Sequence, residues 1–312
     1  MPHTVPLLLA PMQGITNSAL RSLFADWVRP DVVFTEFVRV RPGANPVSRA
    51  DEREMACRNA GPLVVQLIGS DPMGLAAGAL AAQRAGVAHL NLNLGCPSGR
   101  HVARSAGGAL LRSASRLPEL LRRLREAFDG SLSVKVRAGY DNPRQIFDLL
   151  PMFEAASVDF VVLHPRTVVQ AFSGRADHEI TAAAVRRTSL PVIANGDITT
   201  TAEGQRVLQL TGATGLMLGR GALADPVLFE RLRGQAAATP DAAEQALVLR
   251  RLLEGLLPRY QILVRGDAQV LAKLREPLAF VTSPVLQPAV ARLRRAKSLA
   301  AIREVLTAIG SA

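Results

Sequence analysis

The feature that most constrains this chain is a regular alternation of short apolar runs with helix-compatible segments. Eight runs rich in apolar and β-branched residues occupy positions 7–10, 32–35, 63–68, 89–94, 133–137, 160–163, 191–194 and 215–218. Alternating β and α units form parallel sheets. Eight units favour a closed barrel over an open doubly wound sheet, because no GxGxxG turn follows the first run. We therefore expect an α/β fold, a (β/α)8 TIM barrel.

Beyond Arg233 the strand signal stops and the sequence becomes rich in Leu, Ala and Arg. Thr239, Pro240 and Asp241 have the composition of a linker that ends in a helix cap. Prolines divide the remainder into about four helices, the last two expected at 286–295 and 298–309. We expect a catalytic barrel over residues 1–238 and a C-terminal all-helical bundle over residues 239–312.

The chain is strongly basic, with 37 Lys and Arg against 26 Asp and Glu and a formal net charge of +11. Between positions 273 and 303 a single acid, Glu276, accompanies these basic residues: Lys273, Arg275, Arg292, Arg294, Arg295, Lys297 and Arg303. Such a field attracts polyanions, nucleic acid among them. A solvated helical face would show the same pattern.

Composition also argues against several classes of protein. The hydrophobic content is 48%, and no uninterrupted apolar run reaches the roughly 18 residues of a membrane span. The first residues lack Lys or Arg before their apolar run, so we expect no signal peptide and a cytoplasmic location. Two cysteines without clustered histidines predict neither a disulfide framework nor a structural metal. We further expect a monomer.

Polar residues end nearly every apolar run, and the active site of a TIM barrel lies at that edge. The last two runs lead into Asn195-Gly196-Asp197 and Gly219-Arg220-Gly221, glycine turns at the usual phosphate position of the fold. Lys135 and His164 would stabilise a reduced, anionic flavin ring, and Gln66 offers an amide to the ring edge. Each of these residues alone is also compatible with an ordinary turn or polar strand end.

Cys96 is the candidate reactive group. It follows the fourth run between Gly95 and Pro97, in a loop where a thiol is accessible and its protonation can be set by the surroundings. This placement suits a general acid or a nucleophile. Cys57 lies outside any strand end, and we interpret it as a small packed residue.

The chain resembles the tRNA-dihydrouridine synthases. Six stretches carry the resemblance, in order along the chain: residues 10–17 (APMQGITN), 91–98 (NLNLGCPS), 134–139 (VKVRAG), 164–167 (HPRT), 192–197 (VIANGD) and 218–222 (LGRGA).

The resemblance implies FMN in the barrel mouth and NADPH as the reductant. The implied FMN-binding residues are Pro11, Met12, Gln66, Lys135, His164, Asn195, Gly196, Asp197, Gly219 and Arg220. Asn93 and Arg137 would grip a flipped uracil. Reduced FMN would pass a hydride from N5 to uracil C6, and Cys96 would protonate C5 as the general acid.

Within the family the chain resembles the C-type branch, which modifies position 16 of the D-loop. The implied tRNA-orienting residues are Arg39, Lys273, Arg275, Arg294 and Arg295. The chain differs from many members where Gly99 and Arg100 replace a lysine and Pro165 replaces a glycine, and Arg100 or Arg104 could restore the charge.

Two other functions are compatible with parts of the sequence. An FMN barrel acting on a free pyrimidine, of the dihydroorotate or dihydropyrimidine dehydrogenase type, also places Asn and Cys-Pro near a strand end. The basic helical tail argues against it, because a small substrate needs no such surface. The second alternative is an RNA-binding protein whose barrel is only a scaffold. Such a protein would hold no flavin and would be colourless.

Overall fold

The computed structural model describes residues 5–43, 46–56, 61–97 and 105–309. The interpretations of Cys57, Gly99, Arg100 and Arg104 concern positions outside these ranges.

Parallel strands form one sheet of nine, in the order β2-β1-β9-β8-β7-β6-β5-β4-β3, and pairing of β2 with β4 closes it. The strands are β1 (Leu7–Leu9), β2 (Val32–Phe34), β3 (Val38–Arg39), β4 (Leu63–Ile68), β5 (His89–Leu94), β6 (Ser131–Arg137), β7 (Phe160–His164), β8 (Val192–Asn195) and β9 (Gly215–Leu218). The short β3 pairs with β4 alone and was not expected. The other strands coincide with the apolar runs, which confirms the predicted TIM barrel.

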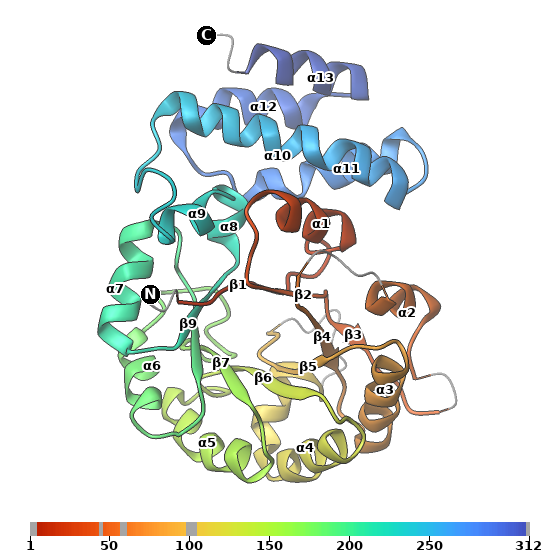
Figure 1. Ribbon diagram of the computed structural model, residues 1–312, viewed down its shortest axis with the longest axis vertical. Helices are drawn as coiled ribbons and strands as arrows, with labels where there is room; N and C mark the ends of the chain where they lie inside the picture. The colour runs from red at the N-terminus through yellow and green to blue at the C-terminus, as the bar shows by residue number, and fades with distance from the viewer. Residues whose placement is uncertain (1–4, 44–45, 57–60, 98–104, 310–312) are drawn as a thin grey trace.

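Helices surround the barrel (Figure 1). They are α1 (Ser18–Trp27), α2 (Arg49–Ala56), α3 (Pro72–Arg84), α4 (Leu117–Glu126), α5 (Ile146–Ala155), α6 (His178–Val185), α7 (Thr201–Thr211), α8 (Arg220–Ala224) and α9 (Leu228–Leu232), with 3₁₀ turns at Gly107–Arg116 and Pro143–Gln145. Side chains of Asn17, Asp71, Asp177 and Thr200 accept backbone N–H groups at the starts of α1, α3, α6 and α7, as expected of N-cap residues. The barrel interior is filled by a separate apolar cluster that includes Leu8, Phe34, Val162 and Met217.

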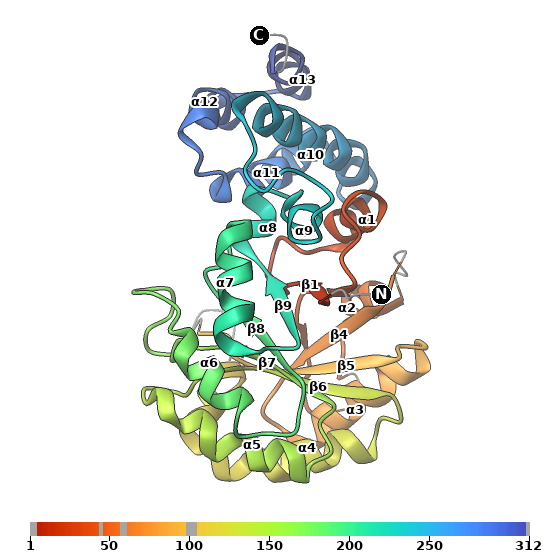
Figure 2. The same ribbon diagram turned by 60° about the vertical axis from the view of Figure 1, so that its left-hand side comes forward.

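The C-terminal region is helical, as predicted. It contains α10 (Ala242–Leu263), α11 (Asp267–Arg275), α12 (Gln287–Arg295) and α13 (Leu299–Ala308), with 3₁₀ turns at Pro277–Phe280 and Pro284–Leu286. Asp241 caps α10. Figures 1 and 2 place this region at one end of the molecule, beyond α1, α8 and α9. Among the described residues, no helix is both long and apolar enough to cross a bilayer.

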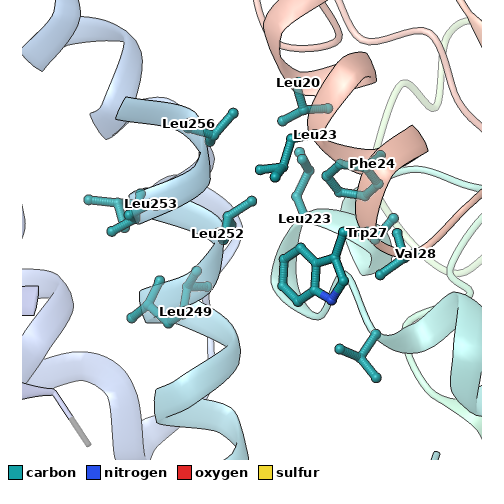
Figure 3. Close-up of a cluster of buried hydrophobic side chains, with 14 of the residues drawn as sticks. Leu20, Leu23, Phe24, Trp27, Val28, Leu223, Leu249, Leu252, Leu253 and Leu256 are labelled. Atoms are coloured by element: carbon teal, nitrogen blue, oxygen red, sulfur yellow. The ribbon is translucent and has the colours of Figure 1, made fainter. Parts of the chain in front are cut away.

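The helical region packs directly on the first barrel helix. Leu252 and Leu256 of α10 point toward the apolar side of α1 (Figure 3). Together with Leu249 and Leu253 they belong to the same buried cluster as β1 and β9. The two helices approach closely at Gly255, where a Cβ atom would lie 2.5 Å from Leu23 Cδ1. One hydrophobic core therefore runs from the barrel into the helical region.

Candidate active site

The carboxyl ends of the barrel strands surround a cavity of about 580 Å³. Its wall contains every residue predicted for catalysis and cofactor binding: Pro11, Met12, Gln66, Cys96, Lys135, His164, Asn195, Gly196, Asp197, Gly219 and Arg220. Asn93 and Arg137, predicted to grip the substrate, line the same cavity. Parallel strands bring these distant positions together because all their carboxyl ends meet at one face of the barrel.

A buried row of side-chain amides ends at the Cys96 loop. Gln66 Nε2 donates to Asn91 Oδ1 at 2.8 Å, and Asn93 Nδ2 donates to Gln66 Oε1 at 2.7 Å. Asn91 Nδ2 in turn donates to Ser133 Oγ at 2.8 Å. Asn93 Oδ1 accepts the backbone N–H of Cys96 at 2.9 Å. Because each amide is oriented by the next, the row fixes the backbone that carries the thiol.

Lys135 and Arg137 place two cations in the cavity wall. Lys135 Nζ donates to the neutral Asn195 Oδ1 at 2.8 Å. Burial, reinforced by Arg137, lowers the pKa of Lys135 to about 7. Burial and then Arg166 lower the pKa of Arg137 to about 10. Because burial and a neighbouring cation both disfavour the charged forms, an anionic ligand at this site would stabilise them.

His164 is held neutral and in one tautomer. Burial, followed by the charge of Lys135, lowers its pKa well below the usual value. The backbone N–H of Arg166 donates to Nδ1 at 3.3 Å, so the proton of the neutral ring is on Nε2. A Cβ atom at Gly196 would lie 3.2 Å from that nitrogen. His164 thus presents an N–H donor beside the Gly196 turn.

The Gly196-Asp197 turn is built from unusual backbone conformations. Gly196 has φ of 120° and Asp197 has φ of 49°, a left-handed conformation that costs a non-glycine residue free energy. The Asp197 carboxylate accepts from Arg166 at 2.9 and 2.7 Å, from Ala176 N at 2.8 Å and from Arg220 Nη2 at 2.9 Å. These bonds fix the turn in the cavity wall, where a glycine turn beside an arginine suits a phosphate.

Sequence reasoning missed two residues that shape the cavity. Phe172 lies in its wall with 60% of the side chain exposed, and the guanidinium carbons of Arg137 and Arg220 are 5.5 and 5.4 Å from its ring centroid. Arg166 is 2% exposed and pairs with Asp197. An aromatic residue in the loop after a barrel strand was the only available signal for Phe172, and the 164–167 stretch contained Arg166 without indicating its role.

Lys273, predicted to orient tRNA, contacts the loop after β1. Its Nζ donates to Gly14 O at 2.9 Å and pairs with Glu276 at 3.1 Å. Burial raises the pKa of the nearby Glu36 carboxyl, and a hydrogen bond from Gly14 opposes that rise. Gly14 is therefore held from both sides, two residues from Met12 in the cavity wall.

The other predicted tRNA-binding residues also lie outside the cavity wall. Arg275 and Arg294 donate to the carbonyl oxygens of Ala296 and Leu278 respectively, within the helical region. The Arg294 and Arg295 residues are exposed, and Arg39 is half-buried at the end of β3. None of these five residues lines the cavity. Arg294 and Arg295 are the most exposed of the five.

A closed parallel barrel whose mouth holds a thiol, a neutral imidazole and the basic side chains Lys135 and Arg137 is the arrangement of a TIM-barrel enzyme. Residues 8–276 match the family described as dihydrouridine synthase (Dus). The chain therefore belongs to the dihydrouridine synthase family, which confirms the family and the enzyme class expected from the sequence.

Individual relatives agree with this assignment. The chain is 35% identical to a tRNA-dihydrouridine(16) synthase of Cupriavidus necator over 79% of each chain. It is 33% identical to a tRNA-dihydrouridine(16) synthase of Ralstonia nicotianae, over 80% of this chain and 79% of the relative. A tRNA-dihydrouridine synthase B of Pseudomonas putida is 31% identical, over 80% of this chain and 75% of the relative. The expected C-type resemblance is thereby confirmed.

Solved structures share the fold at low sequence identity. Morphinone reductase superposes with a TM-score of 0.54 at 14% identity, covering 77% of this chain and 88% of that chain. This likeness supports the barrel architecture alone.

Proposed function

We propose that this chain reduces uridine to 5,6-dihydrouridine in the D-loop of tRNA, at position 16, with FMN as its flavin and NADPH as reductant. The observation that carries the proposal is the shared cavity. Cys96 opens into the same space as the phosphate cradle, by which we mean Gly196, Asp197, Gly219 and Arg220. Membership of the dihydrouridine synthase family supports the reaction. The names of the Cupriavidus and Ralstonia relatives support position 16.

The residues present fit a phosphorylated flavin. Gly196, Asp197, Gly219 and Arg220 line the cavity, where glycine backbone offers N–H groups to a phosphate and the Arg220 guanidinium supplies charge. Lys135, with a pKa depressed to about 7, gains the counter-charge it lacks from an anionic ring. When bound, the flavin supplies the hydride that uracil C6 receives.

The protein side chains provide the proton and the place for the base. Cys96 holds a proton at Sγ and delivers it to uracil C5, in the orientation set by Asn93. The base must leave its stack to enter the cavity. Phe172 offers it an apolar face, and Arg137 offers polar contacts.

The positive surface then holds the tRNA body. We propose that Arg294 and Arg295 contact phosphates directly, while Arg39, Lys273 and Arg275 contribute to the field that orients the tRNA. A net charge of +11 supports a polyanionic substrate. The proposal places a monomeric enzyme in the cytoplasm, where tRNA is modified.

The test is reconstitution with identified components. Flavin released by denaturation should be FMN, and tRNA from a strain lacking this gene should gain dihydrouridine at position 16, faster with NADPH than with NADH. FAD, or no flavin, would contradict the cofactor assignment. Turnover of free uracil without tRNA would favour the free-pyrimidine dehydrogenase, and modification at position 17 or 20 would exclude the position-16 assignment.

A further inference from the structure

Arg166 joins two segments that flank the cavity. Its side chain is 2% exposed, yet every guanidinium nitrogen has an acceptor. Nη1 and Nη2 bind the two carboxylate oxygens of Asp197 at 2.9 and 2.7 Å. Nη2 also donates to Gly174 O at 2.6 Å, and Nε donates to Ser173 O at 3.0 Å. One buried cation therefore ties the turn after β8 to the segment after β7.

The segment after β7, residues 167–176, carries Phe172. Arg137 holds its first half through the carbonyl oxygens of Thr167 and Ala171, at 2.9 and 2.6 Å. Its second half is exposed from Phe172 to Arg175. There the Arg166 bonds, and the bond from Ala176 N to Asp197 at 2.8 Å, provide the attachment to the barrel. The position of the Phe172 ring thus depends in part on where Asp197 lies, together with the contacts that Arg137 and Arg220 make with the ring.

Asp197 also contacts Arg220, the first residue of α8. Its carboxylate pairs with Arg220 at 2.9 Å, and the Arg220 side chain is 45% exposed. The left-handed conformation of Asp197, φ of 49°, persists only while its surroundings hold it. A phosphate engaged by Arg220 and the Gly196 turn would fix both, and so fix the carboxylate to which Arg166 binds.

We propose that Arg166 is a positioning residue that couples occupancy of the phosphate cradle to the order of residues 167–176. Binding of the phosphorylated cofactor strengthens the attachment that sets the Phe172 face for the incoming base. By reciprocity, a base held against Phe172 tightens cofactor binding. The inference rests on the proposed function, because it takes the ligand of the cradle to be FMN.

The first experiment compares two ligands that share a ring and differ in the phosphate. Hydrogen exchange of residues 167–176 is measured in the full-length flavin-free protein, and again with saturating FMN or saturating riboflavin. FMN should slow exchange about fivefold or more, a typical size for coupling between sites, and riboflavin should slow it far less. Equal protection by both ligands, or none by bound FMN, overturns the coupling. Failure of FMN to bind at all contradicts the proposed function itself.

The second experiment removes the connection. Arg166→Met and Arg166→Lys, each measured at saturating FMN, should lose the FMN-dependent protection of residues 167–176 and show a higher KM for tRNA. The control is Arg231→Met. Arg231 is also 2% exposed and pairs with an acid, Asp225, at 2.7 Å. Its loss should lower the free energy of unfolding without removing a contact to residues 167–176.

Arg166→Lys keeps the test valid where Arg166→Met does not fold, because lysine retains the charge and cannot bind both segments with a rigid fork. Retained protection in Arg166→Lys, or the same loss of protection in Arg231→Met, means that Arg166 has no coupling role.

Discussion

Asn93 Oδ1 accepts the backbone N–H of Cys96 at 2.9 Å and that of Gly95 at 3.1 Å. The amide expected to grip the base is therefore also the group that shapes the loop of the reactive thiol. Its Nδ2 is bound to Gln66 at 2.7 Å, so the position of the thiol is connected to the neighbouring strand β4.

Asn93→Ala should separate the thiol from its alignment. The change leaves two backbone donors and Gln66 Oε1 without their partner, so the free energy of unfolding should fall by about 1–3 kcal/mol. The rate of uridine reduction should fall at least tenfold, while flavin reduction by NADPH remains normal. Asn93→Asp keeps the acceptor for Cys96 and loses the donor to Gln66. Its rate of uridine reduction should lie between those of Asn93→Ala and the wild type. Normal uridine reduction in Asn93→Ala would show that the loop carrying Cys96 keeps its conformation without Asn93.

Cys96→Ala should uncouple the two half-reactions. The variant should retain flavin and its reduction by NADPH, but lose about 10²- to 10⁴-fold in uridine reduction, the usual contribution of a general acid. Stopped-flow absorbance of the flavin reports each half-reaction separately. Equal losses in both would assign Cys96 a structural role instead.

Lys135 gives the flavin-free protein a stability that depends on pH. Burial lowers its pKa from 10.5 to about 7, so the unfolded chain binds more protons between those two values. The free energy of unfolding from this residue therefore rises with pH across that window. Lys135→Met lacks this dependence. The variant should exceed the wild type most below pH 7, by a few kcal/mol at most, and the gap should close toward pH 10.5.

Urea denaturation of the two proteins at pH 6.5 and pH 9.5 measures this gap. Parallel stability at both values would mean that the ammonium group is not desolvated in the folded protein.

Charge reversal on α12, by Arg294→Glu or Arg295→Glu, should weaken tRNA binding without changing flavin binding. Each lost phosphate contact at Arg294 or Arg295 should reduce the salt dependence of binding by about one unit of slope. Arg122→Glu on α4, at the opposite end of the molecule in Figures 1 and 2, changes the net charge equally and is the matched control. An equal effect of Arg122→Glu would leave only a general dependence on net charge.

Reversal of both Lys273 and Arg275 should cut tRNA reduction severely. Because Lys273 binds Gly14 O at 2.9 Å, close to Met12 in the cavity wall, we expect a change in flavin affinity as well, which a fluorescence titration measures. Normal tRNA reduction in this double variant would exclude both residues from substrate orientation.

The barrel and its mouth were predictable because each depends on a local pattern. A polar residue in the last few positions of an apolar run lies near the carboxyl edge wherever the sheet is parallel, and Gln66, Lys135 and His164 all line the cavity in this way. The closure of eight strands then brings them together without any further information in the sequence.

The connections between loops were not predictable, because they depend on three-dimensional neighbours. Arg166 reaches Ser173 and Asp197 through a side chain whose direction no periodicity specifies. The direction of Arg275 depends on the rotation of α11, which packing on α10 decides, and its guanidinium is bound to Ala296. A basic run in the sequence therefore does not distinguish charges that face solvent from charges that hold helices together.

The packing of α10 on α1 has a consequence for how the chain is made. Leu20 and Leu23 in α1 are covered by residues of α10, and the Asp26–Arg259 pair joins positions 233 apart in sequence. During synthesis the first helix emerges early and keeps its apolar side exposed until nearly the whole chain has left the ribosome. Burial of the first barrel helix thus waits for a segment that is not part of the barrel, and the unfinished chain should depend on chaperones over that interval.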